Sequence, residues 1–478
     1  MPHSSSVHRL SIPPVDTAPT IAQALGTFAA GLAFVDVPEA ARQNARRAIL
    51  DVVGVAFAGA DAPLARAVRA QAVENWRDGA CSLFGAPARL VPAGAAHANA
   101  VAAHVLDFDA NFNTGMVFAP AVLFPALLAA GEARGASGQT VLTAFAAGTE
   151  VACVLASALS PEPYRKDRDS LFYRGWFNTA VLGPIAAAAA VSRLLGLDAE
   201  ATTRAVAIAA VQAGGLRIGV GSDMKPLLAA RASETGLRAA FLAEAGVQAP
   251  ENAIEGHRGL IATINGGGWT PSAFARLGAF ADPGTSFKLY PACSSVQAAA
   301  EALEALVAHE GLAWDDIARV RCEVTSHIAA NLAFPRPRSV TQAQFSMPFA
   351  LACLLVHGRF AADMLTDARL AEPELSAAMD RVDMVPADLF ADEADARAYP
   401  EATRVVVTLR DGRSFTRQQD ASTGKPANPA SDALLDAKFL RNTSPTLGTE
   451  GAQRLRDVLR AIDAWDDVRT LLALGARP

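Results

Sequence analysis

The sequence contains few cysteines, and their spacing excludes the commonest structural uses of this residue. The five cysteines are odd in number, lie far apart and include no C-x-x-C pair; they are Cys81, Cys153, Cys293, Cys322 and Cys353. A zinc site or a disulfide framework needs closely and regularly spaced cysteines. We therefore expect reduced thiols, no metal site and a cytoplasmic protein.

Basic clusters and long apolar runs are also missing. The formal net charge is -6 and no block of basic residues occurs, so nucleic acid is not an expected partner. Uninterrupted apolar runs such as AVLGPIAAAAAV are shorter than the ~20 residues that span a membrane, so no membrane association is expected. Residues 1–17 lack the apolar segment of a signal peptide and are predicted to be a flexible leader.

Lysine and histidine are scarce. Only five of the 42 basic residues are lysines, namely Lys166, Lys225, Lys288, Lys425 and Lys438. No histidine occurs between residues 105 and 256. Because this chain otherwise uses arginine, each lysine is less expected to be surface decoration.

What is abundant is apolar, helix-forming sequence. Hydrophobic residues make up 51 % of the chain, enough for a large core. Residues 18–270 form a succession of alanine-rich segments with apolar residues at three- and four-residue spacing, which predicts packed helices. The run GGG at residues 266–268 lacks the strand–helix context of a dinucleotide site and instead indicates a boundary.

The pattern changes after that boundary. Residues 318–328 and 403–415 are strand-like, and the second segment contains the hairpin signal DG. Residues 344–358 between them are helical. The sequence therefore predicts a mainly α fold, with a large all-helical domain (18–270 plus 431–478) and a smaller α+β domain (271–430).

Seven segments, in this order, resemble the MmgE/PrpD family. They are LDVVGVAFAGA, AAHANAVAAHVLDFD, RGWFNTAVLGPIAAAAAVSRLLGLD, MKPLLAARASETGLRAAFLAEAG, EGHRGL, FKLYPACSSVQAAAEAL and QAQFSMPFALACLLVHGRF. The resemblance implies a helical domain with an α+β lid, a homodimer, and an active site in the cleft between the domains. The family's dehydratases, decarboxylases and epimerases act at a carbon next to a carboxylate without metal or organic cofactor.

The resemblance points to three catalytic candidates. Asp107 matches the first aspartate of the family motif HxLDFDD, where it transfers a proton or fixes a neighbouring base; a capping or salt-bridged carboxylate is the alternative. Lys225 matches a family lysine and acts as a base if burial lowers its pKa, or binds a carboxylate or enolate if charged; a solvated lysine before a helix is the alternative. Tyr290 matches the tyrosine of KxYP and donates a proton to a planar intermediate.

The remaining candidates are expected either to bind substrate or to support the site. His104 is expected to share a helical face with Asp107, with a core histidine as the alternative, and Asp109 is expected to face elsewhere and support the loop. Cys293 is expected only to pack. The substrate-binding set is His104, Asn111, Phe118, Trp176, Phe177, Arg231, His257 and Lys288. A loop histidine, a helix-surface arginine and a surface lysine are the alternatives for His257, Arg231 and Lys288.

The chain departs from the family where histidines are expected. The family reads DFDDT followed by HPS, whereas this chain has DFDAN, with Asn111 in place of the threonine. The three family histidines fall near Val117 or Phe118, at Phe177 and at Val296. These changes predict a pocket that is less cationic and more aromatic, suited to a substrate larger or less charged than citrate.

The sequence predicts a cofactor-independent lyase or isomerase that transfers a proton alpha to a carboxylate of a small molecule. Lys225 and Tyr290 on opposite faces of the substrate would suit an epimerase or a double-bond isomerase. A dehydratase or decarboxylase with an altered substrate is an alternative and predicts His104 or His257 in the cleft. A non-catalytic binding protein is another, and predicts a collapsed or apolar-filled cleft.

Overall fold

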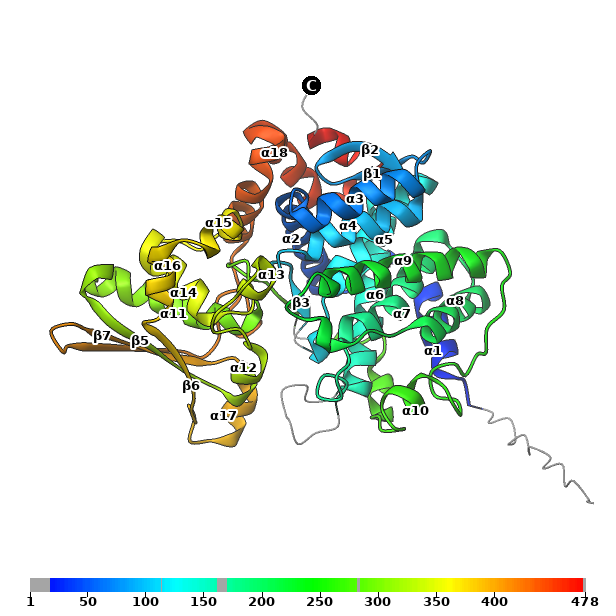
Figure 1. Ribbon diagram of the computed structural model, residues 1–478. Coiled ribbons are helices and arrows are strands. Elements are labelled where there is room, and N and C mark those ends of the chain that lie inside the picture. Colours follow the sequence, from blue (N-terminus) through cyan, green and yellow to red (C-terminus); the bar gives the residue numbers. More distant parts are fainter. Residues whose placement is uncertain (1–17, 113, 161–169, 282–283, 476–478) are drawn as a thin grey trace, which may run out of the picture.

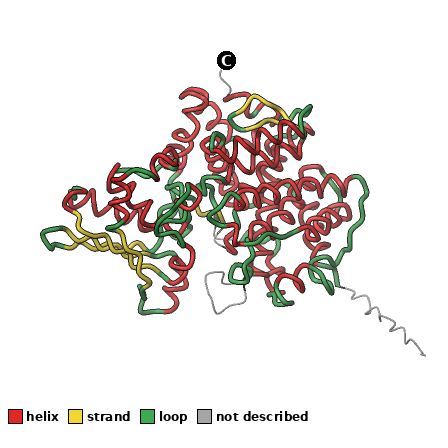
Figure 2. Tube along the Cα trace, viewed as in Figure 1, coloured by secondary structure: helices red, strands yellow, loops and turns green. Residues whose placement is uncertain are grey.

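Helices dominate the computed structural model, which describes residues 18–112, 114–160, 170–281 and 284–475 (Figures 1 and 2). The predicted leader, residues 1–17, lies outside the described residues. One hydrophobic core uses residues between 21 and 287 and again between 430 and 472, and we call this the helical part. A second core, mainly of residues between 290 and 409, defines the α+β part. The mainly α fold class is confirmed, and the domain boundaries at residues 270 and 430 stay a prediction.

The helical part consists of long helices and two short strand pairs. Its helices are α1 (Ile21–Gly31), α2 (Glu39–Gly59), α3 (Pro63–Asn75), α4 (Pro92–His104), α5 (Ala119–Arg134), α6 (Gly138–Leu159), α7 (Asn178–Leu195), α8 (Ala199–Gln212), α9 (Met224–Glu244), α10 (Leu260–Ile264) and α18 (Asp432–Arg460). Its strands are β1 (Cys81–Leu83), β2 (Ala86–Leu90), β3 (Asn111–Phe112) and β4 (Thr285–Ser286). Helix α18 follows the α+β part in the chain and returns to pack on α2, as predicted for the tail.

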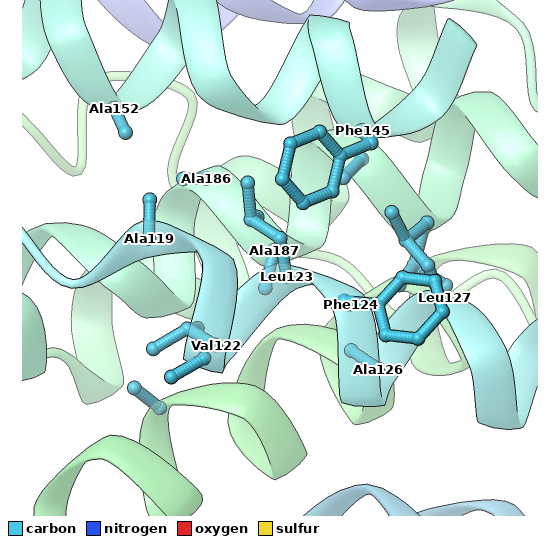
Figure 3. Packing of buried hydrophobic residues seen from close by; sticks show 14 of the residues in the cluster. Ala119, Val122, Leu123, Phe124, Ala126, Leu127, Phe145, Ala152, Ala186 and Ala187 are labelled. Atoms are coloured by element: carbon cyan, nitrogen blue, oxygen red, sulfur yellow. The ribbon is translucent and has the colours of Figure 1, made fainter. Parts of the chain in front are cut away.

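Small residues allow these helices to pack closely. A methyl group added at Gly236 of α9 would lie 2.4 Å from Ala187 Cβ and 2.7 Å from Pro184 O of α7. Larger side chains such as Phe124 of α5 and Phe145 of α6 pack between the helices, as Figure 3 shows. The alanine-rich pattern thus produces a close-packed core.

Among the residues that the structure describes, two helices are long and apolar enough to cross a membrane by length and composition, and the bent pair α2 and α3 would be a third candidate if taken as one span. The two helices are α6 and α7, and 89 % of the apolar window of each is buried inside the protein. Their apolar faces therefore contact other helices of the same chain, which accounts for the unusual hydropathy of these segments.

The α+β part is a four-stranded sheet covered by helices. Its strands lie in the order β6 (Val382–Pro386), β5 (Ile317–Val324), β7 (Thr403–Leu409) and β8 (Ser414–Gln419), with only the β5–β6 pair parallel. Its helices are α11 (Ser294–Glu310), α12 (Ser326–Asn331), α13 (Val340–Ala343), α14 (Met347–His357), α15 (Asp367–Leu370), α16 (Pro373–Met379) and α17 (Glu393–Ala398). Buried residues alternate along β7, as one covered face requires.

The predicted elements of this part are largely present, with one shortened. The DG signal forms the β7–β8 hairpin turn, with Gly412 at φ 89°. The strand predicted at residues 318–328 ends at Val324, because the side chain of Thr325 caps α12 by accepting from the Ile328 amide. Strand β6 was not predicted, because its short VDMVP sequence has a weak alternation.

The chain segment after α4 joins the two parts. Helix α4 ends at His104, and Asp107 lies beyond it with φ 48°, a left-handed conformation. The chain then enters β3, which pairs with β4 immediately before Lys288. This strand pair holds the DFD segment beside the KLYPAC segment, about 180 residues later in the sequence, where the two cores meet.

Candidate active site

The DFD segment forms a turn rather than the helix expected from its sequence. Because α4 ends at His104, a shared helical face cannot bring His104 and Asp107 together. The left-handed backbone at Asp107 does so instead, and this conformation is costly for a residue other than glycine. Lys288 stabilises it by donating from Nζ to the Asp107 carbonyl oxygen at 2.6 Å and to Oδ1 at 3.0 Å.

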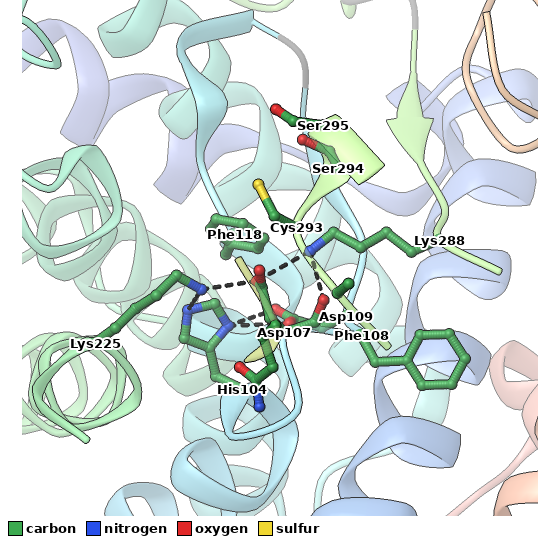
Figure 4. Close-up of polar contacts among 12 residues, drawn as sticks. His104, Asp107, Phe108, Asp109, Phe118, Lys225, Lys288, Cys293, Ser294 and Ser295 are labelled. Carbon is green, nitrogen blue, oxygen red and sulfur yellow. Dashed lines mark hydrogen bonds and ion pairs between the residues drawn. The ribbon is translucent and has the colours of Figure 1, made fainter. Parts of the chain in front are cut away.

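A buried chain of hydrogen bonds links four polar residues (Figure 4). Lys225 Nζ, from α9, donates to Asp107 Oδ1 at 2.8 Å and to His104 Nε2 at 2.9 Å. On the other side of the ring, His104 Nδ1 lies 2.9 Å from both carboxylate oxygens of Asp109. Asp109 therefore faces His104, contrary to the expectation that it supports the loop from elsewhere.

The charges of this cluster follow from its contacts. Burial by itself would raise the pKa of Asp107, but Lys225 and Lys288 more than offset this and hold the pKa at about 2. Burial lowers the pKa of His104 despite the opposing effect of Asp109. Asp107 is therefore ionised and His104 neutral, with Nδ1–H assigned as donor to Asp109 and Nε2 as acceptor from Lys225.

A second buried lysine supports the same turn from behind. Lys438 of α18 donates from Nζ to Asp51 Oδ1 at 2.6 Å and to the Phe108 carbonyl oxygen at 2.9 Å. Burial lowers the pKa of Lys438 and raises that of Asp51, so each depends on the other to stay charged. All four lysines that the structure describes are buried, as the scarcity of lysine suggested.

A cavity of about 50 Å³ lies against this cluster. Its lining combines polar groups with four phenylalanine rings; the residues are Asp107, Asn111, Met116, Phe118, Phe172, Phe177, Asn178, Arg217, Val220, Lys225, Cys293, Ser294, Asn331 and Phe345. Lys225 Nζ lies 4.3 Å from the centre of the Phe118 ring, a cation–π distance. The predicted aromatic character is therefore present, and the rings leave only a narrow space beside Lys225 and Asp107.

Several predicted residues do lie at this site. Asp107, Asn111, Phe118, Phe177 and Lys225 line the cavity, and His104 and Lys288 contact Asp107 or Lys225 from behind. Their catalytic and binding roles stay predictions.

Other predicted residues lie elsewhere. The Tyr290 hydroxyl donates to Glu304 Oε2 at 2.5 Å and lines a separate cavity of about 730 Å³. The Trp176 indole N–H donates to the Ile264 carbonyl oxygen at 3.0 Å, so this residue supports the wall without lining the cavity. His257 and Arg231 are exposed and do not line it either.

The structure adds residues that the sequence analysis missed. Arg217 stacks 3.6 Å from the centre of the Phe172 ring and donates to Asn331 Oδ1 at 3.2 Å. Cys293, expected only to pack, lines the cavity, whereas Val296 is buried in the core of the α+β part. Asn178 and Ser294 also line the cavity without having been predicted. The only signal for them was that Asn178 directly follows GWF and Ser294 directly follows KLYPAC.

The MmgE/PrpD N-terminal domain model matches residues 23–271, and the C-terminal domain model matches residues 290–464. This chain belongs to the MmgE/PrpD family. It is 27 % identical to human cis-aconitate decarboxylase over 96 % of this chain and 95 % of that protein. It is also 27 % identical to the mouse enzyme, over 91 % and 89 %, and 26 % identical to one from Aspergillus terreus, over 94 % of each. The family and these relatives make this protein a lyase-type enzyme.

The carboxylates of this MmgE/PrpD site could bind either a metal ion or the ammonium groups of lysines. His104, Asp107 and Asp109 offer potential metal-ligand atoms within 4.8 Å of one another. Lys225 and Lys288 already bring two ammonium groups to Asp107 Oδ1. A divalent ion would have to displace or repel them, so the donor set fits ammonium ions better than a metal.

The MmgE/PrpD site should also make the protein acid-sensitive. Asp107 and Glu401, whose Oε2 accepts from Lys425, both have folded-state pKa values of about 2 against ordinary values of 3.8 and 4.5. Because both pKa values are lowered on folding, the stabilisation is present above the ordinary values and is lost as the pH falls from there toward about 2. We expect a loss on the order of 5 kcal/mol in unfolding free energy.

Guanidinium chloride unfolding at a series of acid pH values measures this loss. Glu401→Gln is the matched variant: it should be less stable near neutrality, because Lys425 loses its charged partner, but its stability should fall less steeply with acid. Parallel pH profiles for the two proteins would contradict the assignment.

Proposed function

We propose that this enzyme uses Lys225 to deliver a proton to a carbon next to a carboxylate, in a cofactor-independent lyase reaction on a non-citrate carboxylic acid. The observation that carries the proposal is the position of the Lys225 ammonium group. Two of its three N–H donors are held by Asp107 Oδ1 and His104 Nε2, and the residue lines the cavity. No other acceptor for this group occurs among the described residues, so the third donor is available to a substrate.

The chemistry that this geometry supports is protonation of a carbanion-like centre. When a carboxyl group leaves as CO₂, the electron pair of the broken C–C bond stays on the adjacent carbon. Lys225 then donates its proton to that carbon, and solvent restores the ammonium form. The ionised Asp107 and the neutral His104 fix the ammonium group beforehand, so little reorganisation accompanies the transfer.

The charges around the cavity favour a substrate with one or two carboxylates. Lys225 and Arg217 are the cationic side chains among the described lining residues, and Lys225 is already paired with Asp107. The relatives are named for cis-aconitate, which carries three carboxylates. This cavity offers less positive charge than three carboxylates need, and its phenylalanine rings favour an apolar portion of the substrate.

The location of Tyr290 supports the lyase proposal over epimerisation. Epimerisation needs a second group to return the proton on the opposite face, and the residue predicted for this lies in a different cavity. Double-bond isomerisation is the second candidate, because one lysine can remove a proton and return it on the same face. The homodimer and the cytoplasmic location predicted from the sequence stay part of the proposal.

Proton NMR in D₂O with detection of released CO₂ tests the proposed reaction. A panel of unsaturated, substituted and aromatic mono- and dicarboxylic acids is incubated with the enzyme. We expect release of CO₂ and one deuterium in the product, on the carbon atom that carried the departing carboxyl group. Exchange without CO₂ would favour the isomerase, and product without deuterium at that carbon would overturn protonation at this site.

A further inference from the structure

Three buried oxygen atoms at the cavity have no hydrogen-bond partner among the described residues. They are Asp107 Oδ2, Asn111 Oδ1 and Asn178 Oδ1. The exposed fractions of these residues are 1 %, 3 % and 2 %, so bulk water does not satisfy them. Unpaired buried acceptors are uncommon and unfavourable, because each has lost its hydrogen bonds to water without gaining another. Asp107 Oδ2 can only accept, and the two amide oxygens accept as they are placed, which gives this side of the cavity a chemical preference.

The orientation of the Asn178 amide is determined by its other end. Asn178 is the first residue of α7, and its Nδ2 donates to the Gly115 carbonyl oxygen. A flipped amide would set oxygen against oxygen there, so the Asn178 oxygen and not its nitrogen is left unpaired.

Ser294 adds a fourth acceptor. Its hydroxyl donates to Glu401 Oε1 at 2.6 Å, and the same carboxylate oxygen accepts from Ser295 at 2.9 Å. Glu401 is ionised, because Lys425 more than offsets the effect of burial on its pKa, so it accepts and cannot donate. The hydroxyl hydrogen of Ser294 is therefore committed away from the cavity, and its oxygen is left as an acceptor at the lining.

We propose that Asp107, Asn111, Asn178 and Ser294 form an acceptor wall that selects a carboxylic acid bearing hydroxyl or amino hydrogens. The inference rests on the proposed function only in taking this cavity as the substrate site. A substrate with carboxylates alone would leave these acceptors unpaired and bring negative charge against Asp107. Cis-aconitate, which has neither hydroxyl nor amino groups, is the kind of ligand that the acceptor wall disfavours.

Calorimetric titration with two matched sets of probes tests the acceptor wall. The sets are succinate, malate and aspartate, and 3-phenylpropionate, phenyllactate and phenylalanine, each at millimolar concentration. In at least one set, we expect the member with a hydroxyl or amino group to bind at least about 10-fold more tightly than its unsubstituted parent. The reason is that the site accepts a hydrogen bond from that group. Asn178→Leu and Ser294→Ala should each reduce this ratio, and Arg238→Met, an exposed change on α9, should not.

Two results overturn the acceptor wall: no donor-bearing probe binding more tightly than its parent, or a preference that both variants leave unchanged. Two variants are used because Asn178→Leu also loses the hydrogen bond to Gly115, whereas Ser294→Ala removes only a hydroxyl. Binding is measured without turnover, so preferential binding with no CO₂ release or deuterium exchange would retain this inference and reject the proposed function. Turnover of unsubstituted acids with no preference would do the reverse.

Discussion

Replacing Lys225 by methionine should lower turnover by about 10³-fold or more, within the range that a positioned proton donor contributes. Methionine keeps an unbranched side chain of similar length but has no proton to deliver, and Asp107 Oδ1 keeps the hydrogen bond from Lys288. The measurement is kcat and KM on the best substrate of the D₂O panel, with thermal unfolding of the same samples to show that the variant is folded.

Arg238→Met is the matched control for this change, because it replaces an exposed basic residue by methionine on the same helix.

Asp109→Asn is a second variant, with a smaller expected effect on turnover. The amide that this substitution introduces would no longer fix the His104 tautomer, so we expect kcat to fall by about 10- to 100-fold with an altered pH profile and little change in KM. If the Lys225 variant kept more than about a tenth of wild-type turnover, the proton donor would have to be another group.

Replacing Asp107 by asparagine should destabilise the protein by about 3–5 kcal/mol, the typical result of removing one partner of a buried ion pair. Asp107 is the shared anion of two ammonium groups, with Lys225 Nζ at 2.8 Å and Lys288 Nζ at 3.0 Å from the same oxygen. The shape of the side chain is kept, so the effect measures charge. Guanidinium chloride unfolding at neutral pH should show a lower midpoint for the variant.

Asp363→Asn provides the comparison for an exposed ion pair. Asp363 pairs with Arg359 at 2.6 Å, but about half or more of each side chain is in contact with solvent. Removing this charge should change stability by less than about 1 kcal/mol. Equal effects of the two substitutions would mean that the Asp107 cluster is well hydrated and not the buried assembly that its contacts indicate.

The repeating patterns and the rare residues of the sequence were informative because they reflect local rules. Apolar spacing located the long helices, and the DG pair located the β7–β8 turn. Scarcity of lysine suggested buried roles, and all four described lysines proved to be buried. The ordered family segments identified the fold class and residues that line or contact the same site, among them Asp107, Lys225 and Lys288.

The misplaced residues have a common physical cause. A helix was extended through Asp107 because its neighbours are good helix formers, yet the chain turns after His104 and a lysine distant in sequence holds the turn. Tyr290 was placed opposite Lys225 because it matches the tyrosine of the family's KxYP motif. The chain direction there sends its hydroxyl to Glu304 and another cavity instead.

The sequence by itself determined the family, the helical character and the supply of buried cations, because these depend on composition and on spacings of a few residues. Tertiary structure alone decided which groups face one another. Asp109 meets His104 through the left-handed turn, Arg217 reaches Asn331 across 114 residues, and Glu401 orients Ser294 across 107. Such contacts depend on where separate elements pack, and no local pattern of residues encodes that position.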